Sequence, residues 1–311
     1  MKLEGIHHIT AITGDAQGNV DFYAGVLGLR MVKKTVNQDD PSVYHLFYAD
    51  EHGSPGADLT FFEYPGAAPG RPGAGMVYRI VWRVESEDAI AFWEERLGTR
   101  GVSTECVDQA SDAPASALRF RDPEGLEHEL RVVETSDPPL IADHPEVPAA
   151  VALQGFDEAR AYAGSPQASE GLLQSLGFAA RGGGWELRGD RRGGGWFYDP
   201  PPEAAARPGG GTVHHIAWAS EMDDHQGWRR RAMEGGARPT EVIDRFWFRS
   251  IYFREPSGVL FEIATLGPGF DVDEPLEHLG EKLVLPPRFE PAREQIEAQL
   301  TPIENPRTAL R

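Results

Sequence analysis

Hydrophobic and polar positions alternate along much of the chain in short runs, and helical spacing interrupts these runs at regular intervals. Residues 5–13 have the pattern of a strand, and residues 19–27 place apolar side chains at the spacing of a helix that Gly28 ends. Turns rich in Asp, Pro and Gly then separate three further strand-like runs, at residues 30–36, 43–49 and 58–64. The pattern predicts a β-α-β-β-β module.

The same order of elements recurs three more times. The second copy has a strand at 76–84, a helix at 87–97 and strands near Val102, near Leu118 and at 127–132. The third and weakest copy is expected to open with a strand at 149–153, followed by a helix at 170–176 and strands through Phe178, Trp185 and Trp196. The fourth has a strand at 213–219, a helix at 226–234 and strands at 240–242, 249–254 and 260–264. We therefore predict an α+β protein of four βαβββ modules.

Repeated sequence supports the repeated pattern. The second module ends in FRDPEGLEHEL at 120–130 and the fourth in FREPSGVLFEI at 253–263, while the first and fourth modules open with His-His pairs, His7-His8 and His214-His215. We expect two domains, each made of two paired modules, and a tail at 267–311 that wraps the surface. The first domain is 1–136, with modules at about 5–64 and 76–133. The second is 149–266, with modules at about 149–198 and 212–266.

Charge and composition exclude several classes of partner. Asp and Glu number 49 against 30 Lys and Arg, which gives a formal net charge of -19. Such a field repels nucleic-acid phosphates and anionic lipid, so neither partner is expected. The chain has one cysteine, Cys106, and opens without the charged and apolar segments of a signal peptide. A cytoplasmic protein is expected, and we expect a homo-oligomer because paired modules often associate through exposed sheet edges.

Three residues at repeat-related positions have the chemistry of a metal site. Two strand histidines and a strand carboxylate, His8, His215 and Glu262, form the ligand set of a facial triad, which leaves open positions on an iron ion. The second module has Tyr78 and Arg79 where the fourth has its two histidines, and the third module opens without histidine. One complete site is therefore predicted, from the first module paired with the fourth.

Two other glutamates test this assignment. Glu129 occupies the repeat position of Glu262, but it has no histidine partners at the opening of its own module, so we interpret it as structural. Glu63 ends the first module, and strand alternation is expected to turn its side chain to the opposite face.

These residues resemble the hydroquinone-type ring-cleaving dioxygenases of the vicinal oxygen chelate superfamily, also called the glyoxalase/bleomycin resistance/extradiol dioxygenase superfamily. The resemblance spans nearly the whole chain and includes LVLPPRFE at 283–290. It implies Fe(II), with Mn(II) as the alternative, on His8, His215 and Glu262. It also implies that five residues line the substrate pocket: His7, Thr10, His214, Arg245 and Tyr252. The implied reaction opens the ring of a hydroquinone or related diphenol with O₂, so a small aromatic molecule and O₂ are the expected partners.

The chemistry of the pocket residues agrees with that resemblance. Arg245 offers a fixed positive charge that can stabilise a phenolate, although a surface pair with Asp244 is the alternative. Tyr252 and His214 can exchange hydrogen bonds with a phenol, and His7 is alternatively a group that orients its metal-binding neighbour.

Two other functions remain open at this stage. A glyoxalase-type isomerase uses the same fold with two glutamates among its ligands, which requires Glu63 to turn inward. A small-molecule binding protein of the bleomycin-resistance kind uses the same modules around a cleft without iron.

Overall fold

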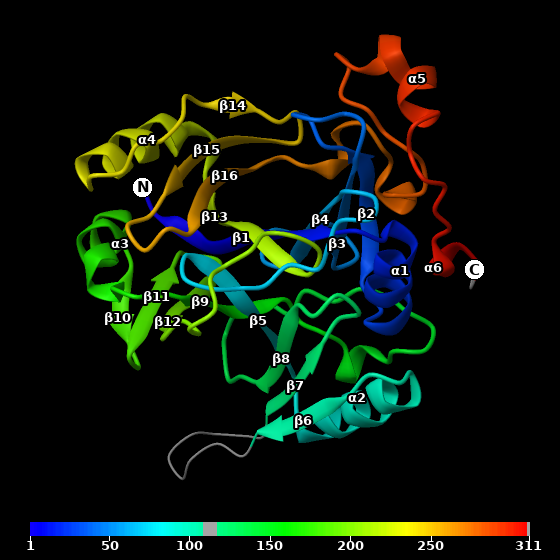
Figure 1. Ribbon diagram of the computed structural model, residues 1–311, viewed down its shortest axis with the longest axis horizontal. Helices are drawn as coiled ribbons and strands as arrows, with labels where there is room; N and C mark the ends of the chain where they lie inside the picture. The colour runs from blue at the N-terminus through cyan, green and yellow to red at the C-terminus, as the bar shows by residue number, and fades with distance from the viewer. Residues whose placement is uncertain (108–116, 310–311) are drawn as a thin grey trace.

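The strands form two eight-stranded sheets (Figure 1), in a computed structural model that describes residues 1–107 and 117–309. The first sheet has the order β14-β15-β16-β13-β1-β4-β3-β2. Its strands are β1 (Leu3–Thr13), β2 (Arg30–Val36), β3 (Tyr44–Ala49), β4 (Asp58–Glu63), β13 (Thr212–Ser220), β14 (Ile243–Asp244), β15 (Phe248–Arg254) and β16 (Leu260–Pro268). The second sheet has the order β10-β11-β12-β9-β5-β8-β7-β6. Its strands are β5 (Met76–Val84), β6 (Thr104–Val107), β7 (Ala117–Arg121), β8 (Glu127–Val132), β9 (Phe156–Tyr162), β10 (Ala179–Arg181), β11 (Gly184–Arg188) and β12 (Gly193–Asp199).

Short helices connect the strands and form much of the tail. The α-helices are α1 (Ala16–Val20), α2 (Glu87–Thr99), α3 (Glu170–Leu176), α4 (His225–Glu234), α5 (Arg293–Glu297) and α6 (Pro306–Ala309), and η1 (Asp21–Val26) is a π-helix. The 3₁₀ helices are η2 (Ala149–Val151), η3 (Pro166–Ser169), η4 (Met222–Asp224), η5 (Phe270–Val272), η6 (Leu276–His278) and η7 (Glu290–Ala292). In the described ranges, no helix has the length and apolar character needed to span a membrane.

Each sheet takes one module from each half of the chain. In the first sheet, β1 runs antiparallel to β13, with Ile9 opposite Ile216. In the second sheet, β5 runs antiparallel to β9, with Ile80 opposite Ala159. The two sheets therefore do not coincide with the sequence halves 1–136 and 149–266. The pairing of the first module with the fourth is the one that the distribution of histidines requires.

The opening of the third module differs from its prediction. Residues 149–153 were expected to form a strand, but Ala149–Val151 is the 3₁₀ helix η2, and the first strand of this module is β9, Phe156–Tyr162. The apolar residues at 149–153 resembled a strand, whereas β9 carries buried or partly buried charges such as Glu158 and Arg160. Those charges are stabilised by ion pairs with other strands, which cannot be read from the local hydrophobic pattern.

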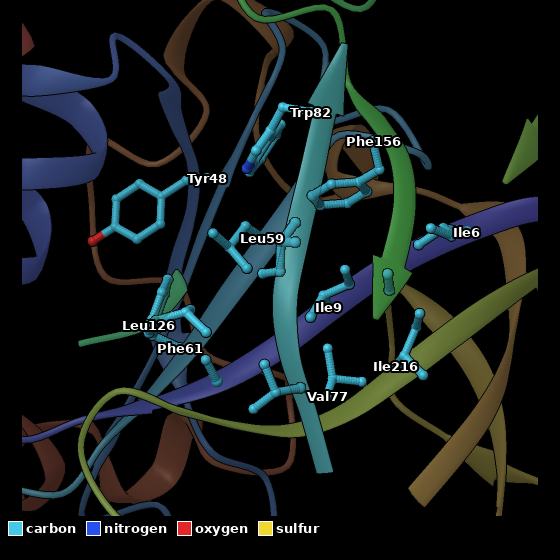
Figure 2. Packing of buried hydrophobic residues seen from close by; sticks show 14 of the residues in the cluster. Ile6, Ile9, Tyr48, Leu59, Phe61, Val77, Trp82, Leu126, Phe156 and Ile216 are labelled. Atoms are coloured by element: carbon cyan, nitrogen blue, oxygen red, sulfur yellow. The ribbon is translucent and has the colours of Figure 1, made fainter. Parts of the chain in front are cut away.

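The hydrophobic core lies where the central strands of the two sheets cross (Figure 2). Ile9 from β1 and Ile216 from β13 lie near Val77 from β5 in this cluster. Trp82 and Phe156, from the paired strands β5 and β9, pack with ring centroids 4.5 Å apart. Burying each large apolar side chain contributes about 2 kcal/mol, so the cluster as a whole, which takes residues from both sheets, stabilises their packing.

The tail packs along the outer strand of the first sheet. Leu283 bridges to Lys34 of β2, and Arg30 donates to the carbonyl of Leu276. The tail therefore lies over the module that contributes His8, as expected for a segment that wraps the surface.

Candidate metal centre

Three adjacent strands bring the predicted ligands together. His8 on β1 lies opposite Ala217 of β13, and Ala217 lies beside Glu262 of β16. The Nε2 atoms of His8 and His215 are 3.2 Å apart, and Oε2 of Glu262 lies 3.2 Å from the first and 2.9 Å from the second. Bonds of about 2.1 Å at right angles would separate three ligand atoms by about 3.0 Å. The observed triangle therefore has the size of one face of an octahedral metal ion.

The preceding histidine determines which ring nitrogen of His8 faces the cluster. Nε2 of His7 lies 3.1 Å from the carbonyl oxygen of Thr265, which only accepts, so this nitrogen donates. Burial, followed by the charge of His8, lowers the pKa of His7 to about 3, so the ring is neutral and its Nδ1 is an acceptor. The 2.9 Å contact between the two Nδ1 atoms is then a donation from His8. Donation through Nδ1 leaves Nε2 of His8 directed toward the cluster, where it can bind a metal ion.

The second histidine pair repeats this geometry. Nδ1 of His214 and Nδ1 of His215 are 2.8 Å apart. Burial lowers the pKa of His215, which favours its neutral ring. A donation from His215 to His214, as in the first pair, likewise directs an Nε2 lone pair toward Glu262. In both cases the neighbouring imidazole orients the ligand.

Glu262 supplies the carboxylate of the cluster. Burial alone would raise the pKa of Glu262, but His8 and His215 hold it well below its usual range, so the carboxyl group is ionised. Ser250 donates to Oε1 at 2.5 Å, whereas the buried Oε2 has no hydrogen-bond partner. A bound cation would stabilise this arrangement, in which a buried carboxylate oxygen lies within 3.2 Å of two imidazole nitrogens. The residues present thus fit a divalent metal ion.

A small cavity adjoins the cluster. His8 and His215 line it, together with two of the five predicted pocket residues, Arg245 and Tyr252. Most of the remaining wall was not predicted from the sequence: Asn37, Gln38, Asp39, His45, Phe47, Phe62, Trp247 and Phe248. Repeat analysis missed His45 because it has no counterpart in the other modules.

The other three predicted pocket residues lie elsewhere. His7 lies behind His8, and Thr10 is buried with its hydroxyl 2.8 Å from the hydroxyl of Thr60. His214 lines a neighbouring cavity that also reaches His215. The expectation that all five line one pocket is therefore corrected. A part for these three in the reaction stays a prediction.

Arg245 pairs with a residue from another module. Both of its terminal nitrogens donate to the Asp39 carboxylate at 2.9 Å, and its Nε donates to the Tyr252 hydroxyl at 3.3 Å. Asp244, the partner considered from the sequence, instead accepts from the backbone of Phe246. Burial raises the pKa of the Tyr252 phenol above its usual range, so its proton stays available for donation toward the cavity.

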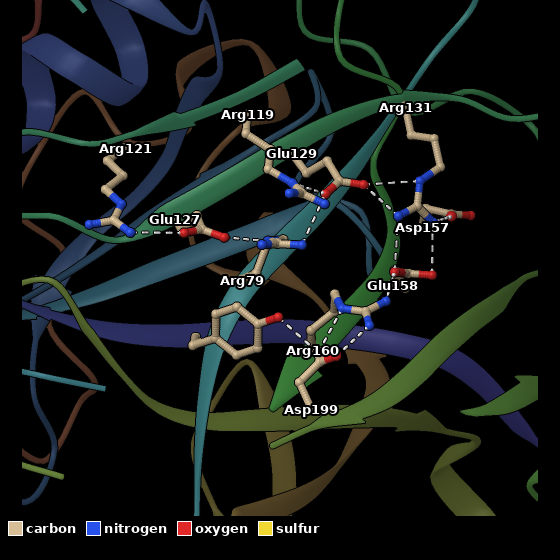
Figure 3. Close-up of polar contacts among 11 residues, drawn as sticks. Arg79, Arg119, Arg121, Glu127, Glu129, Arg131, Asp157, Glu158, Arg160 and Asp199 are labelled. Atoms are coloured by element: carbon tan, nitrogen blue, oxygen red, sulfur yellow. Dashed lines mark hydrogen bonds and ion pairs between the residues drawn. The ribbon is translucent and has the colours of Figure 1, made fainter. Parts of the chain in front are cut away.

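The second sheet has an ion network where the first sheet has the cluster (Figure 3). Strand register makes Glu129, which lies beside Val81, equivalent to Glu262, which lies beside Ala217. The same register makes Glu158 equivalent to His8 and Arg79 equivalent to His215. Three arginines donate to the Glu129 carboxylate: Arg79 at 3.2 Å, Arg119 at 2.7 Å and Arg131 at 2.5 Å. Glu129 is thus neutralised by side chains of the protein.

Two sheets of this topology, with a His-His-Glu cluster at the centre of one of them, define the vicinal oxygen chelate class of proteins. The chain belongs to the Glyoxalase/Bleomycin resistance protein/Dioxygenase superfamily, whose family model matches residues 5–130 and 174–263.

Relatives of known name extend over nearly the whole chain. A protein of Bacillus subtilis (strain 168) named as a ring-cleaving dioxygenase, MhqO, is 42% identical and aligns with 97% of each chain. Chlorohydroquinone/hydroquinone 1,2-dioxygenase of Sphingobium indicum is 32% identical, over 95% of each chain.

Solved structures agree with the fold. A crystal structure from Bacillus subtilis, named as a dioxygenase, superimposes with a TM-score of 0.90 at 41% identity over 98% of each chain. Glyoxalase I of Zea mays has a TM-score of 0.56 at 11% identity, covering 84% of this chain and 92% of its own. This second likeness concerns the fold alone.

Proposed function

We propose that this chain uses Fe(II) to cleave the aromatic ring of a hydroquinone or a closely related diphenol with O₂. Its membership of the superfamily and its full-length similarity to ring-cleaving dioxygenases make it an oxidoreductase of the dioxygenase type. Iron, and a 1,4-diphenol as the substrate, are the proposed parts. The observation that carries them is the convergence of His8, His215 and Glu262 at 2.9–3.2 Å beside an aromatic-walled cavity.

His8, His215 and Glu262 would hold the metal on one face and leave its other positions toward the cavity. Ferrous iron in such a site supplies the path by which electrons pass from an aromatic ring to O₂. His7 and His214 keep the two ligand rings in the required tautomer and orientation. These contacts prepare the site before substrate enters.

Two cavity residues are suited to a phenol that loses its proton. The Arg245 guanidinium stabilises negative charge on the substrate oxygen, and Asp39 holds it in place by a two-point contact. The Tyr252 hydroxyl accepts from Arg245, so its own proton can be donated to a substrate oxygen. Phe62 and Phe248 provide apolar walls that exclude water from the ring.

Neither alternative has a specific observation in its favour. Among the described residues, one cluster of His, Cys, Asp and Glu side chains could hold a metal ion, with Glu262 as its one carboxylate, whereas the glyoxalase-type isomerase chemistry uses two glutamates. Glu63 lies at the end of β4 next to Thr13, one residue past the cavity-lining Phe62, so strand alternation directs it to the opposite face. The ionised and buried Glu262 is hard to reconcile with a binding protein that holds no metal.

Oxygen uptake by anaerobically loaded protein tests the proposal. Fe(II)- and Mn(II)-loaded samples are offered hydroquinone, methylhydroquinone, chlorohydroquinone and catechol, and the product is analysed by mass after reaction with ¹⁸O₂. We expect stoichiometric O₂ uptake with hydroquinones on Fe(II) and two heavy oxygen atoms in a ring-opened product. A Glu262→Ala variant should lose both iron and turnover, while the matched Glu129→Gln variant should keep them. Absence of uptake from protein with one bound iron per chain would overturn the proposal.

A further inference from the structure

His45 is a cavity residue that lies apart from the metal cluster. It is on β3, and β4 separates that strand from β1, which carries His8. Its ring packs against Phe47 with centroids 4.0 Å apart and against Phe62 with centroids 4.4 Å apart. These two contacts hold the imidazole in one position in the cavity wall, two strands away from His8. A polar ring fixed among aromatic walls is the kind of group that orients a ligand.

A short chain of hydroxyl groups determines which nitrogen of His45 carries the proton. Nε2 of His45 lies 2.9 Å from the hydroxyl oxygen of Thr60, which lies 2.8 Å from the hydroxyl oxygen of Thr10. If His45 donated to Thr60, the proton of Thr60 would go to Thr10, and the fully buried Thr10 proton would need a further acceptor. Among the described residues, Thr60 is the one side chain that hydrogen-bonds the Thr10 hydroxyl. The reverse direction, from Thr10 to Thr60 to His45, satisfies both hydroxyl protons.

The consequence is a free donor on the other side of the ring. Burial, and then the charges of His8 and His215, keep the pKa of His45 well below its usual range, so the ring is neutral. A neutral ring that accepts at Nε2 carries its proton on Nδ1. Nδ1 of His45 has no hydrogen-bond partner in residues 1–107 and 117–309, although the residue lines the cavity. A donor without a partner at a cavity wall requires an oxygen atom from a ligand or from water.

We propose that His45 is a specificity-determining residue, whose Nδ1–H group donates a hydrogen bond to the second oxygen of a 1,4-diphenol while the first oxygen lies at the metal cluster. This inference rests on the proposed function. The two oxygens of a hydroquinone lie at opposite ends of the ring, so when one is beside His8 and His215 the other is directed away from them. The two oxygens of a catechol are adjacent, and both lie on the side of the metal. His45 therefore favours the para isomer.

Binding of two phenols of the same shape isolates this hydrogen bond. 4-Methoxyphenol has an oxygen acceptor at the para position, whereas 4-ethylphenol has a methylene group there and cannot accept. Their dissociation constants are measured by calorimetry on Fe(II)-loaded protein without O₂, so no turnover is needed. We expect the wild-type protein to bind 4-methoxyphenol about ten-fold more tightly, the ratio that one satisfied buried hydrogen bond gives.

Three variants of His45 separate the donor from the packing. His45→Phe keeps the aromatic contacts with Phe47 and Phe62 but removes both nitrogens, and its ratio should fall to about one. In His45→Asn the side-chain amide nitrogen is as many bonds from Cβ as Nδ1 is, so a preference for 4-methoxyphenol should remain. In His45→Gln the amide nitrogen corresponds to Nε2, so the preference should be lost. Equal iron content and equal circular dichroism spectra establish that each variant is folded.

The outcomes distinguish this inference from the function on which it rests. A wild-type ratio near one, or an undiminished ratio in His45→Phe, would overturn the role of His45 even if hydroquinone is oxidised. A ratio that falls in His45→Phe and His45→Gln but persists in His45→Asn supports it. The ratio could follow this supporting pattern while the wild-type protein consumes no O₂ with hydroquinone. In that case the role of His45 in phenol binding is supported and the proposed dioxygenation of hydroquinone is overturned.

Discussion

Lys33 of β2 is a fully buried cation that forms ion pairs with the tail. Its replacement tests whether an unpaired buried charge destabilises this fold. Its ammonium group donates to Oδ1 of Asp273 at 2.9 Å, to Oε2 of Glu274 at 2.5 Å and to the carbonyl oxygen of Phe270 at 3.0 Å. It also lies 5.3 Å from the ring centroid of Trp247, a residue of the cavity wall. Lys33→Met keeps the length of the side chain but leaves two carboxylates without their cation.

Removing one partner of a buried ion pair costs about 3–5 kcal/mol. With a shift of roughly 2–4 °C per kcal/mol in large domains, Lys33→Met should lower Tm by about 6–20 °C. Lys34→Met on the same strand is the control, because the Lys34 ammonium makes one long contact of 3.4 Å with a carbonyl oxygen. That variant should change stability by less than about 1 kcal/mol.

The pH dependence gives a second and independent readout. Burial already raises the pKa of Glu274, against the opposing effect of Lys33, so loss of the lysine raises this pKa further. A carboxyl group whose folded pKa exceeds its unfolded pKa destabilises the fold at high pH, and this penalty fades as pH falls through the folded pKa. The destabilisation by Lys33→Met, measured by chemical denaturation, should be larger at pH 7.5 than at pH 5. A loss below 1 kcal/mol, or one that is independent of pH, would refute the reasoning.

Three further predictions concern the two polar centres. His8→Ala and His215→Ala should lose bound metal to a similar extent, measured by metal analysis after dialysis, and full iron content in either would contradict a shared site. Removal of the metal by a chelator should lower Tm by roughly 5–11 °C, since saturation at a hundred times Kd contributes about 2.7 kcal/mol, and the two alanine variants should show no such response. Glu129→Gln should destabilise the protein by about 3 kcal/mol in denaturant titrations without loss of iron, because its arginines then lack a buried counter-charge; depletion of iron would contradict its structural role.

Strand positions were largely predictable because most strands bury an alternating or continuous apolar pattern. The runs predicted at 76–84 and 127–132 are β5 and β8 as observed, Met76–Val84 and Glu127–Val132. The prediction failed at 149–153, where apolar residues form a 3₁₀ helix and the true strand carries Glu158. A strand stabilised by ion pairs with other segments has no local hydrophobic signal.

The metal cluster was predictable for a different reason from the rest of the cavity. His8 and His215 repeat one sequence motif at two equivalent strand positions, so comparison of modules was enough to pair them. His45 and Asp39 occur once, on a strand and in a turn that reach the cavity only after the first and fourth modules have joined. The partner of Arg245 is likewise 206 residues away along the chain. Contacts between unique residues of distant segments leave no pattern in a single sequence.

The two sheets meet the same physical demand in different ways. Each sheet has a buried glutamate, Glu262 beside β13 in the first sheet and Glu129 beside β5 in the second. Neither charge can remain in the interior without a compensating positive charge. In the second sheet, Arg79 occupies the position of a ligand histidine, and with Arg119 and Arg131 it supplies permanent positive charge at Glu129. In the first sheet, the imidazole of His215 stands at the position of Arg79 and that of His8 at the position of Glu158, and a cation bound there would supply the positive charge. Both sheets have the glutamate, so the difference between them lies in the neighbouring side chain, which is an arginine in the second sheet and a histidine in the first.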